Sequence, residues 1–420
     1  MRILILLAIL LCIDLYVFQG IRVLTSGREA GTQRVVHSLF WLVTAVAIGT
    51  IAGGQIFDWH TWPRAVSTYL FAMVVIVYLS KLFVVAFLLT DDVVRAIRWI
   101  AMKMQTLFSD QTTRELAGIQ RPGINRLTFL VQLGFIVGAV PFFSMIYGMI
   151  KGATDFTIRR KEMKFANLPS GFHGFRIVQI SDMHLGSYFS DEPLKRAIGL
   201  IMDQKPDVIL FTGDLVNDLH TEALPYKDLL MQMKAPHGVY SVLGNHDYGE
   251  YYRWKDPEDK KQNLDNLKQF QNDLGWKLLL NEHAYIEKGG EQLGLIGVEN
   301  WSARMNFQRY GDMKKATEGM KKLPFNILMS HDPSHWKSEV VIDYPQVDLT
   351  LSGHTHGMQF GVEIPGFKWS PVQYVYKEWA DLYSTNRQHL YVNRGLGFIG
   401  YPGRVGILPE ITVIDLVRGA

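Results

Sequence analysis

The chain has 420 residues, more than one ordinary domain holds, and its length predicts two domains. Its net charge of +3 and the lack of an aromatic and basic RNA-binding pattern give no reason to expect a nucleic acid partner. The single cysteine, Cys12, excludes an intramolecular disulfide and a cysteine cluster for zinc or iron-sulfur, and a mean hydropathy of +0.04 is high for a soluble enzyme.

The apolar excess lies in the first third of the chain, where four segments are long enough to cross a bilayer. They are Met1–Gly20, Val36–Ile56, Ser67–Leu89 and Leu127–Ile150. The alternative for the first segment is a cleavable signal peptide, but no convincing cleavage site follows it, which favours an uncleaved anchor. Residues 1–150 are therefore predicted to form a transmembrane helical domain of a multi-pass protein in the plasma (inner) membrane.

Between the third and fourth segments, Asp91 to Phe108 mixes basic with apolar residues, a pattern typical of a helix lying at the membrane interface. A short buried helix of the soluble domain is the alternative. Positive charges flank the spans on both sides. By a small margin they favour an external C-terminal domain, so the side of the membrane stays open.

Residues 151–172 are polar and basic, and we expect a juxtamembrane tether that leads to a catalytic domain over 173–420. This domain begins with the alternation of strand, helix and strand that is typical of a buried sheet: an apolar run over Phe175–Ile180, a helical period over Asp191–Lys205 and a second apolar run over Pro206–Thr212.

Five strand-like runs of the catalytic domain end in residues that bind metals or transfer protons. After Phe175–Ile180, Pro206–Thr212, Gly238–Leu243, Phe325–Met329 and Val347–Leu351 come Asp182 and His184, Asp214, Asn245 and His246, His331, and the pair His354 and His356. Taken singly, each also fits a turn aspartate or a core histidine. Because ligands gather at the carboxyl ends of strands in open α/β sheets, five such ends together indicate one site.

The last of these motifs is Gly353-His354-Thr355-His356-Gly357. In an extended segment, residues i and i+2 point to the same side, so the two imidazoles can face one small volume. Glycine on both flanks allows close approach of the backbone. The motif therefore predicts a metal site.

This ordered set of motifs resembles the calcineurin-like metallophosphoesterases from about Phe175 to the end of the chain, and the preceding spans resemble that family's membrane-anchored branch. The resemblance implies an α/β fold, a four-layer αββα sandwich preceded by an all-α transmembrane domain, with a two-metal centre. It assigns Asp182, His184 and His356 to one ion, Asn245, His331 and His354 to the other, and Asp214 to a bridge between them.

Carboxylates, imidazoles and one amide without thiolate suit divalent Mn, Fe, Zn or Co. Two such ions activate water, so no serine or cysteine nucleophile is required. By the same resemblance, His246 protonates the leaving oxygen. Where many relatives carry an aspartate that orients this histidine, the chain has Asn217. We expect the amide to accept the hydrogen bond of His246 and leave it less basic, which predicts a lower pH optimum.

Downstream, Leu390–Asn393 reads as a further strand, and Ile411–Leu416 reads as the strand that closes the sandwich. Arg394 and Arg404 follow the first of these, and their guanidinium groups could clamp a substrate phosphate with two hydrogen bonds each. Simple solvation at the surface is the alternative for each arginine.

Two insertions are rich in aromatic residues and are expected to border the metal centre. They contain Tyr248, Tyr251, Tyr252 and Trp254, and Phe367, Trp369, Tyr374, Tyr376, Trp379 and Tyr383. Packing beneath long loops is one interpretation. The other is an apolar rim that faces the bilayer and admits an acyl chain.

The sequence thus predicts a membrane-anchored, metal-dependent phosphohydrolase, with manganese among the candidate metals, that cleaves a phosphodiester or pyrophosphate, possibly of a lipid. Similarity to the branch with UDP-2,3-diacylglucosamine hydrolases makes lipid A biosynthesis a candidate, although that step needs a cytoplasmic site. The alternative is a catalytically silent scaffold or regulatory domain of a membrane protein. A transporter or sensor has little support, because Asp14 is the only acidic residue well inside a span. The expected partners are the bilayer and a phosphate ester, and the oligomeric state stays open.

Overall fold

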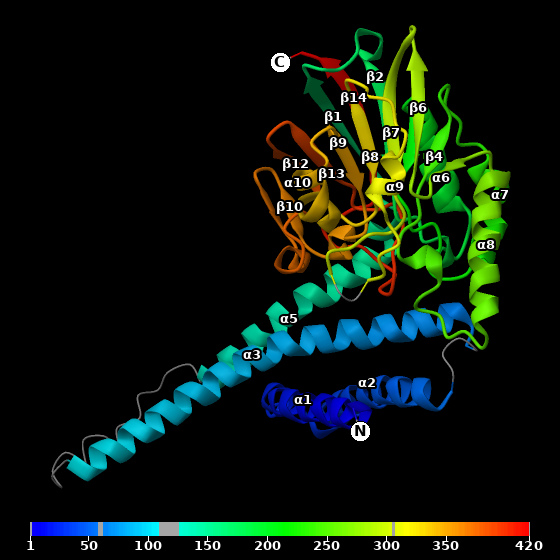
Figure 1. Ribbon diagram of the computed structural model, residues 1–420. Coiled ribbons are helices and arrows are strands. Elements are labelled where there is room, and N and C mark those ends of the chain that lie inside the picture. Colours follow the sequence, from blue (N-terminus) through cyan, green and yellow to red (C-terminus); the bar gives the residue numbers. More distant parts are fainter. Residues whose placement is uncertain (1, 58–61, 109–125, 305–306, 420) are drawn as a thin grey trace. The chain divides into compact units, whose positions relative to one another are not determined.

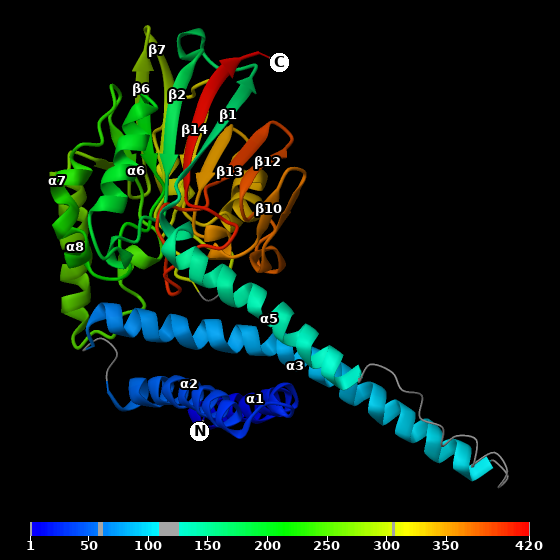
Figure 2. The same ribbon diagram turned by 180° about the vertical axis from the view of Figure 1, so that it is seen from behind.

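The computed structural model describes residues 2–57, 62–108, 126–304 and 307–419. These residues form two compact units that divide between Ile146 and Tyr147 (Figures 1 and 2). The first unit is helical and the second contains all the β-sheets of the described residues, as the change of sequence texture after the fourth apolar segment predicts.

Four long helices make up the N-terminal part of the chain: α1 (Arg2–Thr25), α2 (Ala30–Ile56), α3 (Arg64–Phe108) and α5 (Arg126–Ile150). Each contains a segment long and apolar enough to span a membrane. The four spans predicted from the sequence are therefore confirmed as helices of the right length and composition, and the last turn of α5 belongs to the second unit.

The prediction of an interfacial helix over Asp91 to Phe108, distinct from the third span, is wrong. This segment continues α3, which has 45 residues and so a length of about 68 Å. The sequence across the junction contains neither glycine nor proline, and Arg95 pairs with Asp91 one turn earlier at 3.0 Å. Because nothing interrupts the backbone hydrogen bonds, the apolar span and the charged segment form one helix.

The helical unit buries one ion pair. Asp14 of α1 pairs with Lys81 of α3 and accepts a hydrogen bond from the Tyr78 hydroxyl at 2.7 Å. All three side chains are at least nine-tenths buried. A paired charge avoids most of the cost of an ionised group inside an apolar bundle, so Asp14 has a structural role here.

Two six-stranded sheets form the second unit. The first runs β1 (Thr157–Phe165), β14 (Glu410–Arg418), β2 (Phe175–Ile180), β3 (Val208–Phe211), β4 (Val239–Ser241) and β5 (Lys277–Leu278). The second runs β12 (Asp381–Thr385), β13 (Gln388–Val392), β9 (Leu349–Ser352), β8 (Asn326–Met329), β7 (Glu291–Gly297) and β6 (Glu282–Lys288). Strands β2 to β5 are parallel to one another, as are β13, β9, β8 and β7.

Alternate residues of the strands face two different layers. In β2, Ile177 joins the core between the sheets, while Val178 joins the core beneath the outer helices α6 (Glu192–Asp203), α7 (Lys227–Leu230) and α8 (Pro257–Asp273). In β8, Ile327 faces the inner core and Leu328 packs towards α9 (Met313–Thr317) and α10 (Val341–Asp343). The four-layer αββα sandwich is confirmed (Figure 1).

The tether expected over residues 151–172 is corrected by the structure. Its central part is β1, which pairs in parallel with β14 from Thr157 opposite Glu410 to Phe165 opposite Arg418. β14 therefore lies inside the sheet rather than closing it. Only Met163 and Phe165 of β1 are buried, and charged residues occupy its exposed positions, as is common in edge strands. That composition hides the strand from a reading based on hydrophobic runs.

Candidate metal centre

The five predicted strand ends meet at one edge of the two sheets. β2, β3 and β4 of the first sheet and β8 and β9 of the second lead into the loops with the candidate ligands. Because these strands are parallel within each sheet, their carboxyl ends lie side by side. The seven candidate ligands are Asp182, His184, Asp214, Asn245, His331, His354 and His356. The structure brings them together.

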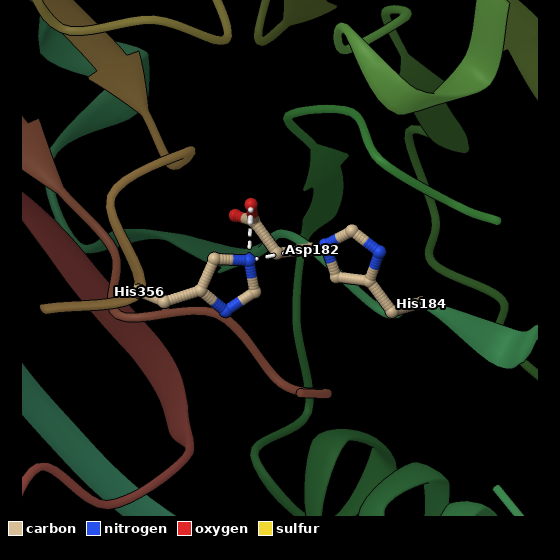
Figure 3. A group of neighbouring side chains, drawn as sticks. All are labelled: Asp182, His184 and His356. Carbon is tan, nitrogen blue, oxygen red and sulfur yellow. Dashed lines mark hydrogen bonds and ion pairs between the residues drawn. The ribbon is translucent and has the colours of Figure 1, made fainter. Parts of the chain in front are cut away.

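Asp182, His184 and His356 form one close group, as Figure 3 shows. Their ligand atoms all lie within 4.8 Å of one another, and His356 Nε2 lies 3.0 Å from His184 Nε2 and 3.2 Å from Asp182 Oδ1. All three side chains are buried. Two imidazole nitrogens and a carboxylate that converge in this way are arranged for a metal ion.

Asp182 also belongs to a second group with Asp214 and His331. His331 Nε2 is buried and lies 3.1 Å from Asp214 Oδ2, while its Nδ1 donates to the Thr212 carbonyl at 2.7 Å. That second bond fixes the ring so that Nε2 points at the carboxylates. A buried imidazole nitrogen directed at two carboxylates is the arrangement that a site for a second cation requires.

The remaining two candidate ligands contact each other. His354 Nδ1 lies 2.7 Å from Asn245 Oδ1, and His354 Nε2 lies 2.8 Å from the Tyr376 hydroxyl. The same hydroxyl donates to Asp332 Oδ2 at 3.1 Å. Asp332 and Tyr376 therefore orient His354 from behind, a role that no local sequence pattern indicates.

Five of the seven residues adopt left-handed backbone conformations. The φ angles are 52° for Asp182, 45° for His184, 59° for Asp214, 70° for His354 and 49° for His356. Aspartate and histidine enter this region more readily than most residues, yet single occurrences are uncommon. Backbone strain concentrated in one place is typical of a functional site, because the surrounding structure has to maintain it.

The charges of the group are mutually dependent. Burial alone would raise the pKa of Asp182, but the neighbouring His356 and His331 outweigh it and lower that pKa. Burial would likewise lower the pKa of His331, but the carboxylates of Asp214 and Asp182 raise it to about 10. A proton thus occupies the place among these carboxylates that a divalent cation would take.

His246 and Asn217 are adjacent, but not in the predicted way. His246 Nδ1 donates to the main-chain carbonyl of Asn217 at 2.8 Å, whereas the Asn217 side chain places Oδ1 3.1 Å from His184 Nδ1. The expectation that the amide side chain orients His246 is therefore wrong, and with it the reason for a less basic His246.

Arg394 and Arg404 do not face a substrate. Both side chains are buried, and Arg394 pairs with Glu410 at 2.5 Å and with Glu363 at 2.8 Å. Arg404 Nη2 donates to the carbonyls of Gly395 and Gly397 and lies 3.2 Å from His356 Nδ1. The predicted phosphate clamp is wrong, since neither guanidinium lines the cavity described next. Arg404 instead supports the backbone beside His356.

A cavity of about 340 Å³ opens over the candidate ligands. Its lining residues are Asp214, Asn245, His246, Tyr251, Phe307, His354, His356 and Ile399. Tyr251 contacts two of the candidate site residues. Its hydroxyl accepts a hydrogen bond from Asn245 Nδ2 at 2.9 Å, and the centroid of its ring lies 4.5 Å from that of His246. No sequence pattern indicates Phe307 and Ile399, which lie in irregular loops.

The aromatic residues of the two insertions differ in where they lie. Tyr251 and Tyr376 reach the site as expected. Trp379 is buried in a small core with Val372 and Ile407 beneath a neighbouring loop, so packing describes it better than a rim. Phe367 and Tyr374 remain more than half exposed.

Asp247 holds two loops of the site together. Its carboxylate accepts from the backbone N–H groups of Gly244, Asp214 and Leu215 at 2.8 to 2.9 Å. These donors belong to loops after two different strands, so one side chain fixes the spacing between Asp214 and Asn245. No local sequence pattern indicates this role of Asp247.

Comparison with known proteins gives two family matches. Residues 1–153 match the family described as "Probable Calcineurin-like phosphoesterase, transmembrane domain". Residues 175–358 match the family described as "Calcineurin-like phosphoesterase". The boundary between the matches falls close to the boundary between the two units of the structure.

Three curated proteins illustrate the similarity. The chain is 34% identical to the uncharacterized metallophosphoesterase YkuE of Bacillus subtilis, over 60% of this chain and 83% of the relative. It is 31% identical to the UDP-2,3-diacylglucosamine pyrophosphatase LpxG of Chlamydia trachomatis, over 55% of this chain and 81% of the relative. It is 29% identical to the phosphodiesterase YaeI of Escherichia coli, over 58% of this chain and 82% of the relative.

Proposed function

Because the chain belongs to the calcineurin-like metallophosphoesterases and is a hydrolase of the multi-pass membrane type, we propose that it cleaves a phosphodiester or pyrophosphate bond of a membrane lipid with two divalent metal ions. The observation that carries the proposal is the convergence of seven potential ligands from five strand ends. The transmembrane domain over residues 1–150 would hold the catalytic domain at the bilayer, with the plasma (inner) membrane as the proposed location.

The donor set fits two ions. We assign Asp182, His184 and His356 to one ion, Asn245, His331 and His354 to the other, and Asp214 to both. Oxygen and imidazole ligands without thiolate suit Mn, Fe, Zn or Co, and the buried Nε2 of His331 beside the carboxylates of Asp214 and Asp182 supports a second ion. When bound, such a pair of ions activates water and stabilises both oxygens of an in-line displacement at phosphorus.

The protein supplies a proton donor. The Nδ1 of His246 is held by the Asn217 carbonyl, so Nε2 is the ring nitrogen left to exchange a proton with the leaving oxygen. The ring of Tyr251 packs against His246 and restricts its rotation. Asn217 acts by positioning His184 through its side chain and His246 through its main chain.

Two features support a lipid substrate. Apolar groups of Tyr251, Phe307 and Ile399 form part of the cavity lining. Two residues after Ile399 begins the segment Tyr401–Val405, whose Arg404 N–H donates to the carbonyl of Gly148 in the last turn of α5. Since α5 is a candidate membrane span, we infer that the cavity lies close to where the chain leaves the bilayer. Similarity to the UDP-2,3-diacylglucosamine pyrophosphatase LpxG suggests a diacylated nucleotide sugar as a candidate substrate. Lipid A biosynthesis is then the candidate process.

A catalytically silent scaffold is the second candidate, but it would be expected to lose ligands, and all seven are present here. The test uses detergent-purified protein stripped of metal and titrated with Mn, Zn or Mg. It compares a chromogenic phosphodiester with the matching monoester, in the wild type, Asp214→Asn and His246→Ala. Cleavage that metal restores and both variants lose supports the hydrolase. Binding of metal without cleavage of any ester, including lipid esters, would favour the scaffold.

A further inference from the structure

The short hairpin of β10 (Val362–Ile364) and β11 (Phe367–Trp369) extends from the second unit directly after the candidate metal ligands. The two strands are antiparallel and joined by Pro365 and Gly366. The paired positions are Val362 with Trp369, Glu363 with Lys368, and Ile364 with Phe367. Because side chains alternate between the faces of a strand, the charged pair lies on one face and the two apolar pairs lie on the other.

The charged face is turned towards the protein. Glu363 pairs with Arg159 and with Arg394, each at 2.8 Å. Lys368 donates to the Ala380 carbonyl at 2.5 Å and lies over the ring of Trp379. These contacts fix the hairpin to the unit, which a two-stranded hairpin needs because it is scarcely stable alone.

The apolar face is turned away from the protein. The exposed fractions are 44% for Val362, 58% for Ile364 and 54% for Phe367, and nearby Tyr374 is 77% exposed. A sheet in water has the opposite arrangement, with its apolar face buried and its polar face solvated. The charged face fixes the hairpin to the second unit and leaves the apolar face exposed. An exposed apolar surface of this kind indicates an interaction with an apolar partner.

The base of the hairpin lies beside the end of α5. The Gly361 N–H donates to the Val405 carbonyl at 2.9 Å, and the adjacent Arg404 N–H donates to the Gly148 carbonyl at 3.2 Å. Gln359 bonds to the carbonyl of Gly403 at 3.0 Å. One short segment thus separates the hairpin from the last turn of a helix that is long and apolar enough to span a membrane.

We propose that the hairpin inserts its apolar face into the headgroup and upper acyl region of the bilayer from which α5 emerges. The continuity with α5 identifies the partner as lipid rather than a separate protein. Trp369 and Tyr374, whose side chains meet at 3.4 Å, suit this depth because each combines an apolar ring with a polar tip. The proposal does not depend on which ester the enzyme cleaves.

The test places a fluorescent label at single cysteines in the full chain, reconstituted into vesicles of phosphatidylcholine and phosphatidylglycerol. Cys12→Ser removes the only native cysteine, and Ile364→Cys or Phe367→Cys adds the site. The matched control is Lys164→Cys, an exposed position seven residues along β1 from Thr157 and so about 23 Å from the strand end that follows α5 in the chain. Lipids with a spin label high or low on the acyl chain serve as quenchers.

We expect the labels at 364 and 367 to be quenched several-fold more than the label at 164, and more by the shallow than by the deep spin label. Equal quenching at all three positions would overturn the proposal. A second result would also overturn it: the label at 364 is shielded from aqueous iodide but is not quenched by the spin-labelled lipids, and its fluorescence changes with the protein-to-lipid ratio. A second copy of the chain would then cover the apolar face. Thermal unfolding of each labelled protein checks the fold, and either hairpin position alone decides the result.

Discussion

His246 donates its Nδ1 hydrogen to the main-chain carbonyl of Asn217, while the side chain of Asn217 contacts His184. One residue therefore positions the candidate proton donor with its backbone and a candidate metal ligand with its amide. A substitution at 217 should remove only the second function, since every residue has a carbonyl.

We predict that Asn217→Ala weakens metal binding and leaves proton donation intact. Loss of an outer-shell partner of a metal-binding histidine typically costs roughly 10- to 100-fold in metal affinity. The measurement is a metal titration of hydrolysis by stripped enzyme. The apparent Kd for metal should rise, whereas kcat at saturating metal and its pH profile should stay close to the wild type. A changed pH profile with unchanged metal affinity would contradict this.

The leaving group should decide how much His246→Ala costs. A proton donor contributes about 100- to 10,000-fold when the leaving oxygen is basic, and much less when it is a stable phenolate. We expect a large loss of kcat for an alkyl phosphodiester and a small loss for a nitrophenyl diester, compared at saturating metal. Equal losses for both esters would show that His246 acts in binding or folding instead.

Metal binding should release protons and strengthen with pH. Burial would lower the pKa of His331, but Asp214 and Asp182 raise it to about 10, so this imidazole is protonated at neutral pH in the metal-free protein. A cation must displace that proton, and the apparent affinity should rise roughly tenfold per pH unit for each proton released. Calorimetric titration between pH 6 and 8, in buffers of different ionisation enthalpy, measures both quantities. Affinity independent of pH would contradict the prediction.

Asp218→Asn should stabilise the protein at alkaline pH. Burial, with repulsion from Glu222, raises the pKa of Asp218 from 3.8 to about 7. A folded pKa above the unfolded value means that the folded state binds the proton more tightly. The stability this adds is present below pH 3.8 and is lost as the pH rises to 7. Asparagine carries no charge, so the variant should gain about 1–3 kcal/mol relative to the wild type between pH 4 and pH 8. Thermal unfolding at both pH values measures the difference, and a gain that is the same at both would exclude this cause.

Arg394 should matter for stability and not for phosphate binding. Arg394→Ala leaves Glu410 buried without its main partner, a change that costs about 3–5 kcal/mol for a buried pair. The unfolding midpoint should fall, and Arg394→Lys should recover part of it. Competitive inhibition by inorganic phosphate should be unchanged in the protein that remains folded. Weaker inhibition would restore the original idea of a phosphate clamp.

The chain carries much of its organisation in local patterns. Length and uniform apolarity identify four membrane spans, and short apolar runs ending in Asp182, Asp214, Asn245, His331 and His354 identify the strands and the place where they meet. Both signals are local because a span needs only continuous apolar residues and a buried strand only a short apolar run. The candidate ligands could be proposed for the same reason, since each of them follows its strand directly.

Other features depend on segments that are distant in sequence. β1 is recognisable only beside β14, more than 240 residues later, because its own residues are mostly charged. The burial of Arg394 follows from Glu410 and Glu363, which no local pattern connects with it. The acceptor for His246 is a backbone carbonyl, and carbonyls are the same in every residue. By itself the sequence determined which groups are present at the site and which strands deliver them. Only the tertiary structure decided which group contacts which, because hydrogen bonds and ion pairs depend on positions in space that distant segments set together.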